Sequence, residues 1–151
     1  MTADGRFVTF TSASANLVVG DGNGDSDVFV RDVVAGTTTR VSVSTSGGDA
    51  DGYGSFGHIA ADGRYVAFLS DAGNLVAGDT NGVDDVFVRD RQANTTRRVS
   101  LGPGGRQANR ESYSASVSAD GRLVAFESFA SNLVPGDSND TGDVFVRFPM
   151  P

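Results

Sequence analysis

Apolar residues occur along this chain in short runs, each bounded by glycine, asparagine, aspartate or serine. Residues 65–69 and 86–88 are two such runs, and no stretch carries a sustained apolar stripe with the period of about 3.6 residues that an amphipathic helix needs. The many valines, threonines and phenylalanines favour strands, and 20 glycines in 151 residues suit tight turns. The pattern predicts an all-β fold of short antiparallel strands.

The same pattern returns every 58 residues. Ala3-Asp4-Gly5-Arg6 recurs at 61–64 and 119–122, and Asp27-Val28-Phe29-Val30-Arg31 recurs at 85–89 and 143–147. Fixed periods of this kind indicate supersecondary units that stack and share a core. A unit of 58 residues would bury only a marginal core alone, so the units are expected to pack against one another.

Each complete unit is predicted to contain four strands, which the middle copy places at residues 56–60, 64–70, 85–90 and 97–101. Asp62-Gly63 between the first two is a strong hairpin signal, because both residues tolerate positive φ. The first strand is rich in small residues, which suits a crowded position near a central axis. Four antiparallel strands make one blade-like sheet.

The chain is predicted to be a single repeat domain, residues 1–151, with units of about 1–54, 55–112 and 113–151. On this scheme the strands number three, four and three, because the first unit lacks its first strand and the third lacks its last. Pro149 and Pro151 would stop a further strand there. The three blade-like units would then have the same fold and form one domain.

Charge and composition exclude several classes of function. A net charge of −7 and a pI near 4.4 would repel a phosphate backbone, so nucleic acid is not an expected partner. No apolar run approaches the ~20 residues that span a bilayer, so a membrane partner is not expected either. The absence of cysteine and a lone His58 exclude thiolate and histidine-rich metal centres. The first residues lack the features of a signal peptide, which leaves a mature, truncated or cytoplasmic chain as the alternatives.

Residues 118–126, followed by Asp143-Val144-Phe145-Val146-Arg147, resemble the WD-like β-propeller repeat of TolB and the tricorn protease. In that family an S-x-D-G-x-x-[IV]-[AV]-[FY] stretch forms the first two strands of a blade, and D-[IV]-[FY]-[VL] forms the third. All three copies match, except that Met1-Thr2 replaces the first strand of copy one. The resemblance covers nearly the whole chain, with a longer excursion between the second and third strands.

The resemblance implies four-stranded blades arranged radially around a central channel, usually four to eight of them. Three blades, two of them incomplete, cannot close such a ring. Either the sequence is a piece of a longer chain, or copies assemble as a homo-oligomer, with a two-chain, six-blade ring as the simplest closed form. An extracellular or periplasmic location is what the resemblance implies.

The loops before the third strand of each unit are the best candidates for chemistry, and they hold nine of the 19 acidic residues. In copy one, oxygen-bearing side chains occupy alternate positions, a spacing by which a tight loop can wrap calcium. Copy one is the fullest site, because Val83 and Thr141 replace the carboxylate of Asp25 in the other copies. The candidate metal ligands are Asp21, Asn23, Asp25, Asp27, Asp79, Asn81, Asp85, Asp137, Asn139 and Asp143.

The alternative for these loops is purely structural. Asp and Asn beside Gly form Asx-turns and tolerate a left-handed backbone, and Asp27, Asp85 and Asp143 could simply hold the start of the third strand. No bidentate Glu stands at the twelfth position of an EF-hand loop. The sequence leaves both alternatives open.

No catalytic site is predicted. His58 has no serine or aspartate partner in a recognisable triad pattern, and no serine sits in a Gly-x-Ser-x-Gly elbow. The repeated arginines and phenylalanines are expected to be architectural, because they recur once per blade. The sequence favours a non-catalytic β-propeller repeat module for protein or ligand binding and self-assembly, with calcium as its candidate cofactor; the alternative is an accessory propeller region of a hydrolase or protease.

Overall fold

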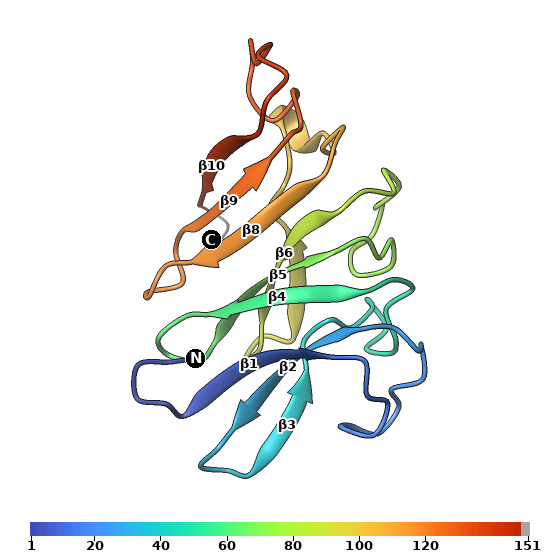
Figure 1. Cartoon of the computed structure of the whole chain (residues 1–151), viewed down its shortest axis with the longest axis vertical. Coiled ribbons are helices and arrows are strands. Elements are labelled where there is room, and N and C mark those ends of the chain that lie inside the picture. Colours follow the sequence, from blue (N-terminus) through green and yellow to red (C-terminus); the bar gives the residue numbers. More distant parts are fainter. Residues whose placement is uncertain (149–151) are drawn as a thin grey trace.

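The structure is a computed structural model that describes residues 1–148. Its regular elements are ten strands in three antiparallel sheets and one 3-10 helix, Pro103–Gly105 (Figure 1). The prediction of an all-β fold is therefore confirmed. Within these residues no helix is long and apolar enough to cross a membrane.

The sheets are stacked blades with three, four and three strands, as the repeat predicts. Blade one has the order β1-β2-β3, blade two the order β4-β5-β6-β7, and blade three the order β8-β9-β10. Their bounds are β1 Phe7–Ser12, β2 Asp27–Asp32, β3 Thr37–Arg40, β4 Gly54–Ile59, β5 Tyr65–Ser70, β6 Asp85–Asp90, β7 Thr95–Arg98, β8 Ser112–Val117, β9 Val124–Ser128 and β10 Asp143–Arg147. Pro149 and Pro151, which were expected to stop a further strand, lie outside the described residues.

All three blades keep the same strand register. Phe68 on β5 lies opposite Phe87 on β6, and their rings stack with centroids 5.7 Å apart. The equivalent pairs in the other blades, Phe10 with Phe29 and Phe126 with Phe145, stack at 5.5 and 5.6 Å. Because side chains alternate along a strand, this register places one aromatic pair on the same face of every blade.

The predicted bounds of the first and fourth strands need correction. The fourth strand of blade two is β7 (Thr95–Arg98) rather than residues 97–101, because a four-residue turn with Asn94 at φ 57 returns the chain earlier than expected. The first strand is β4 (Gly54–Ile59) rather than residues 56–60, and it contains a register shift between Ser55 and His58. Phe56 in this bulge has a φ of 52°.

The hydrophobic core lies between blades rather than within them. One cluster joins Val28, Val30 and Val41 of blade one to Phe68 and Phe87 of blade two. A second cluster joins the opposite face of blade two to blade three. The phenylalanines and valines that repeat in blades two and three thus lie between blades, as expected of units that pack against one another, and a single blade would leave one face uncovered.

Small residues on the inner strands allow the blades to approach closely. Figure 1 shows β1, β4 and β8 side by side at the inner edge of the three sheets. A Cβ added at Gly57 of β4 would lie 2.6 Å from Val28 Cγ1 of blade one. This contact explains why glycine stands in the middle of β4, and it confirms that the first strand of a unit is crowded.

Candidate functional site

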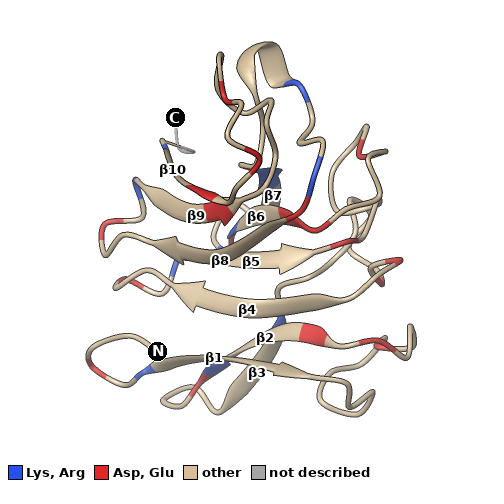
Figure 2. Cartoon of the chain, turned by 45° about the horizontal axis from the view of Figure 1, so that its top comes forward, with Lys and Arg blue, Asp and Glu red and all other residues tan. Residues whose placement is uncertain are grey.

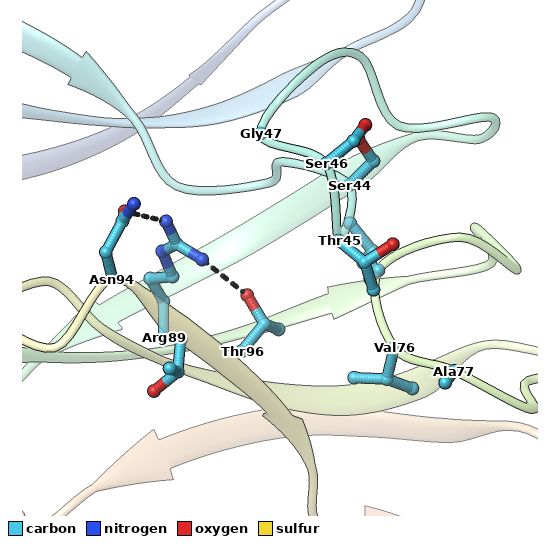
Figure 3. A pocket seen from close by; sticks show the side chains of 11 residues that line it. Ser44, Thr45, Ser46, Gly47, Val76, Ala77, Arg89, Asn94 and Thr96 are labelled. Atoms are coloured by element: carbon cyan, nitrogen blue, oxygen red, sulfur yellow. Dashed lines mark hydrogen bonds between the residues drawn. The ribbon is translucent and has the colours of Figure 1, made fainter.

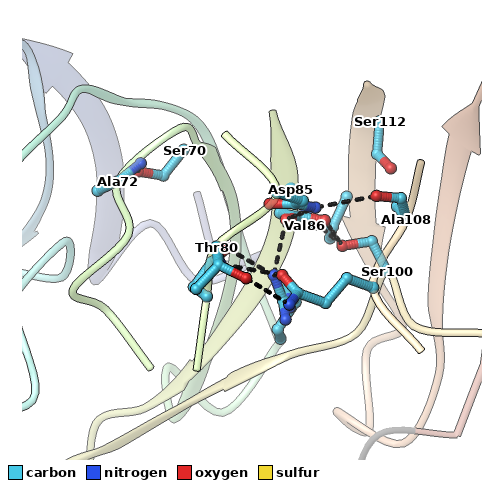
Figure 4. Close-up of polar contacts among 12 residues, drawn as sticks. Ser70, Ala72, Thr80, Asp85, Val86, Ser100, Ala108 and Ser112 are labelled. Carbon is cyan, nitrogen blue, oxygen red and sulfur yellow. Dashed lines mark hydrogen bonds and ion pairs between the residues drawn. The ribbon is translucent and has the colours of Figure 1, made fainter. Parts of the chain in front are cut away.

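The acidic loop of blade two folds around the buried carboxylate of Asp85, at the start of β6 (Figure 4). Ser100 Oγ donates to Asp85 Oδ1 at 2.5 Å, while Asn81 Nδ2 and Arg98 Nη1 donate to Oδ2 at 2.8 and 3.0 Å. Ser100 Oγ in turn accepts the backbone N–H of Val86 at 3.1 Å. A buried carboxylate is stable here because hydrogen bonds and a cation replace its water.

Blade one repeats this arrangement around Asp27. Ser42 Oγ donates to Asp27 Oδ1 at 2.5 Å, and Asn23 Nδ2 and Arg40 Nη1 each approach Oδ2 at 3.2 Å. Arg40 also contacts Asp21 at 3.2 Å and Asp49 at 2.6 Å. Three carboxylates thus share one guanidinium, which leaves two negative charges uncompensated in this cluster.

Burial raises the pKa of Asp21, and the nearby Asp27 carboxylate raises it further against the opposing effect of Arg40. Burial likewise raises the pKa of Asp79, whose carboxylate lies 2.7 Å from Arg98 Nη1. In residues 1–148 no group of three or more histidine, cysteine, aspartate or glutamate side chains is arranged to hold a metal ion. In the first two loops an arginine stands beside the carboxylates where a metal cation was predicted.

The remaining predicted ligands are distributed unevenly. Asp25 is exposed, and its backbone N–H donates to Asn23 Oδ1 at 3.1 Å, as in an Asx-turn. In copy three, Asn139 Nδ2 donates to Asp143 Oδ2 at 3.1 Å. Asp137 has no ion-pair partner within the described part of the chain. Figure 2 shows that acidic residues concentrate in loops and at strand ends.

Sequence reasoning missed the arginine and serine of these clusters. Arg40 and Arg98 are separated by the 58-residue repeat, and so are Ser42 and Ser100. That spacing was the available signal, because a basic residue in register with a repeated aspartate is its natural counter-charge. The loop carboxylates were instead considered as metal ligands or as Asx-turn residues that hold the start of the third strand.

An Asn-Leu-Val segment that recurs at residues 16–18, 74–76 and 132–134 also has a structural role that sequence alone did not reveal. Asn74 Oδ1 accepts the backbone N–H of Asp51 at 3.2 Å, and its Nδ2 donates to the carbonyl of Asp49 at 3.1 Å. Leu75, the next residue, is buried between blades one and two. The long excursion of blade two is thereby fastened to the connection that leaves blade one, and Asn132 makes the equivalent bonds between blades three and two.

The Asp-Gly-Arg turn joins neighbouring blades. Arg64 lies 4.7 Å from the centroid of the Tyr65 ring and pairs with Asp90 at 2.7 Å, an architectural role within blade two. Gly63 has a φ of 75°, and a Cβ there would overlap the Phe7 ring of blade one. Glycine is therefore required both by the turn and by the aromatic ring beneath it.

His58 lies on the inner strand β4 with its side chain exposed. Its Nδ1 accepts the backbone N–H of Val117 on β8 at 3.2 Å, so it bridges blades two and three. Partial burial lowers its pKa, which favours the neutral imidazole that can accept this bond.

At each end of the stack, the terminal blade exposes a sheet face whose equivalent in blade two is covered by a neighbouring blade. On blade three, Val144 is 76% exposed and Val146 is 56% exposed, whereas their counterparts on blade two, Val86 and Val88, are 0% and 2% exposed. The difference arises because blade three covers the valines of blade two, and no described residue covers those of blade three. We call this surface, formed by Val144, Val146, Ala125 and Glu127, the trailing face.

The opposite end shows the same effect more weakly. Val8 and Phe10 of blade one are half-buried, while their counterparts Val66 and Phe68 are 0% exposed. Gly5, in the Asp-Gly-Arg turn of blade one, has no atom within 4 Å of a Cβ added to it. We call the surface formed by Val8, Phe10 and Gly5 the leading face.

Comparison with solved structures identifies the architecture. The tricorn protease matches 86% of this chain with a TM-score of 0.52 and 15% sequence identity. The blades are of the TolB and tricorn β-propeller type. A TolB structure from Agrobacterium tumefaciens matches 98% of this propeller chain with a TM-score of 0.50 and 18% identity, and an acylaminoacyl peptidase matches 82% with a TM-score of 0.50 and 17% identity.

The matched region is a limited part of each of these proteins. This chain spans 10% of the tricorn protease, 16% of the acylaminoacyl peptidase and 48% of the TolB structure. No protein-family model and no curated protein matches the sequence. At these identities the likeness establishes the propeller fold alone.

Proposed function

We propose that this chain is a non-catalytic β-propeller module that binds protein or ligand partners and assembles with a second copy of itself. The observation that carries the proposal is the exposure of Val144 and Val146 at positions that are buried in the other two blades. Large apolar side chains exposed together on one sheet face indicate an interaction site, and Glu127 is the charged residue beside them, at the position of Leu69 in blade two.

The packing between blades within the chain indicates how the surfaces of two copies would pack. Within the chain, the surface of blade two that is equivalent to the leading face, with Phe68 and Phe87, packs against Val28 and Val30 of blade one. Because the repeat preserves the phenylalanines and valines of these faces, with Glu127 in place of Leu69, the leading face of one copy suits the trailing face of another. Such a head-to-tail contact is heterologous and closes when the rotation between copies completes a ring. Two copies of three blades would give a ring of six, within the usual range of about four to eight.

The contacts of the Asp-Gly-Arg turns support the same pairing of the leading face with the trailing face. Gly63 and Gly121 each cover the aromatic residue of the preceding blade, Phe7 and Tyr65 respectively. Gly5 has no such neighbour, and Leu123 occupies the corresponding position of blade three. In the proposed assembly Leu123 of one copy would lie beneath Gly5 of the next. Each fully buried valine or leucine would stabilise the interface by about 1.5–3 kcal/mol.

The non-catalytic part of the proposal rests on what the repeated residues do. Arg6 and Arg64 pair with Asp32 and Asp90, the phenylalanines fill the inter-blade core, and the acidic loops of blades one and two are engaged by Arg40 and Arg98. The alternative is an accessory propeller region of a hydrolase or protease, in which the open faces would pack against other parts of the same polypeptide. That arrangement predicts no self-association.

Calcium binding is a further part of the proposal, and the copy-one loop supports it best. There Asp21, Asp27 and Asp49 share Arg40, so excess negative charge remains. Calcium prefers carboxylate and carbonyl oxygens, which this loop supplies. A calcium ion would have to displace Arg40 from the Asp27 carboxylate or bind the cluster from its open side.

Substitution of Val144 by glutamate tests the assembly. Val144→Glu would place a charge in the proposed interface and should convert the assembly to monomer, as measured by light scattering. Val34→Glu is the matched control, because Val34 is also 76% exposed but lies in the turn between β2 and β3, away from both faces. Equal masses for wild type, Val144→Glu and Val34→Glu would contradict the proposal.

A further inference from the structure

A cavity of about 350 Å³ lies between blades one and two, on the outer side of the sheets (Figure 3). One wall is the hydroxyl-rich loop Ser44–Gly47, a second is the apolar stretch from Leu75 to Ala77, and a third is formed by Arg89, Asn94 and Thr96. Its volume is near the lower end of the roughly 300–1,000 Å³ that ligand pockets occupy. The cavity therefore suits a small molecule or a single terminal residue.

The cavity contains a buried cation without a counter-ion. Arg89 is only 8% exposed, yet no Asp or Glu lines the cavity and no carboxylate of residues 1–148 forms an ion pair with it. Its guanidinium donates to Thr96 Oγ1 at 3.0 Å and to Asn94 Oδ1. A guanidinium has five N–H groups, so these two bonds leave donors for a ligand.

The same position in blade three holds an arginine that bonds to main-chain carbonyls. Arg147 donates to the carbonyl of Leu101, in the connection that leaves blade two, and to the carbonyl of Leu133, between β9 and β10 of its own blade. Arg89 makes no bond to the counterparts of these carbonyls, at Val43 and Leu75, among the hydrogen bonds of the described residues. The space that Arg147 crosses between blades two and three corresponds to the open cavity between blades one and two.

The hydroxyl-rich wall is specific to this pair of blades. The loop that faces Arg89 is Ser44-Thr45-Ser46-Gly47, whereas the corresponding loop of blade two is Gly102-Pro103-Gly104-Gly105. Figure 3 shows Arg89 and Asn94 on one side of the cavity and Ser44, Thr45 and Ser46 on the other. Hydroxyl groups can donate to the same anion that a guanidinium binds, and the valine beside them can contact an aliphatic group.

We infer that this cavity is a binding site for a small aliphatic carboxylate, either free or at the C-terminus of a peptide. The guanidinium of Arg89 binds the carboxylate, the serine and threonine hydroxyls bind its remaining lone pairs, and Val76 contacts the aliphatic group. Burial lowers the pKa of Arg89, and a bound carboxylate would offset that effect. The site lies within one chain, so it does not depend on the proposed assembly.

Calorimetric titration of the full chain with N-acetylvaline tests the site, with N-acetylvalinamide as the neutral analogue and sodium sulfate as a non-aliphatic anion. A short peptide ending in valine, with a free or an amidated C-terminus, distinguishes a chain end from a free acid. We expect both free carboxylates, or one of them, to bind, and the amides to bind at least about tenfold more weakly, because a charge-assisted hydrogen bond is lost. Equal binding of acid and amide, stronger binding of sulfate, or no binding at millimolar concentrations would overturn the proposal.

Two variants and one control variant assign the binding to Arg89. Arg89→Gln should weaken N-acetylvaline at least about tenfold, whereas Arg147→Gln, at the same repeat position but away from the cavity, should bind as wild type does. Ala77→Glu keeps Arg89 and places a competing carboxylate from an exposed position on the cavity wall. Ala77→Glu should also weaken the binding of N-acetylvaline, with an unchanged melting temperature. If Arg89→Gln does not fold, the affinity of Ala77→Glu tests the cavity as the binding site. Wild-type affinity in folded Ala77→Glu and in any folded Arg89→Gln would overturn the assignment.

Discussion

Replacement of Gly63 by alanine measures how strongly the turn of one blade depends on the ring of the preceding blade. Gly63 has a φ of 75°, and an added Cβ would overlap Phe7. Gly5 provides a matched control, because it occupies the same turn of blade one with a φ of 71° and has open space around it. The two substitutions share the backbone strain and differ in the contact with an aromatic ring.

The expected magnitudes follow from these two terms. A left-handed backbone costs alanine about 1–2 kcal/mol, so Gly5→Ala should lower the free energy of unfolding by that amount. Gly63→Ala should add about 1–3 kcal/mol for overpacking against Phe7, for a total of about 2–5 kcal/mol. The difference between the two variants is therefore the inter-blade term.

Urea denaturation at a protein concentration where the chain is monomeric provides the measurement, with the slope of the transition checked for constancy. Phe7→Leu in the Gly63→Ala background should recover part of the loss, since leucine stands at the equivalent position of blade three, Leu123. Equal losses for Gly5→Ala and Gly63→Ala, with no recovery by Phe7→Leu, would refute the contact between turn and ring.

Three further predictions concern the charged groups. The hydrogen bonds from Arg64 lower the pKa of Asp90 from 3.8 to about 2, so the stability that Asp90 contributes should be present above pH 3.8 and lost as the pH falls toward 2; denaturation across this range should show a weaker pH dependence in Asp90→Asn. Ser100→Ala should cost about 1–3 kcal/mol in thermal or urea unfolding, because it leaves the buried Asp85 carboxylate without one donor, and an unchanged stability would contradict the cluster. Calcium at a hundredfold excess over its dissociation constant should stabilise the chain by about 2.7 kcal/mol relative to chelator, and Asp21→Ala should abolish most of that gain; identical melting curves would leave the loops as Asx-turns.

The sequence predicted best where local chemistry and the repeat agree. The third strand of blade two begins at Asp85 and ends at Asp90, as expected, because polar residues bound its apolar centre. The fourth strand was predicted to begin two residues and end three residues too late, because its bounds depend on the Asn94 turn, whose left-handed residue could not be identified from composition. The short 3-10 helix at residues 103–105 was not predicted from the sequence.

The candidate site was harder to predict, for a physical reason. A loop of aspartates has the same sequence pattern whether its charge is neutralised by a metal ion or by an arginine from another strand. Arg98 lies 13 residues from Asp85 and reaches it only because β6 and β7 pair in the observed register. The exposure of Val144 and the cavity beside Arg89 likewise depend on which blades stand next to each other, and a repeat pattern makes all blades look equivalent.

The molecular mass of the wild-type chain in solution tests the central claim, that its leading and trailing faces join copies of the chain. Light scattering at micromolar concentration should give twice the chain mass of 15.6 kDa if two copies close a ring. The particle should dissociate on dilution, because its interface is non-covalent. A compact monomer of 15.6 kDa across the concentration range would contradict the proposed assembly.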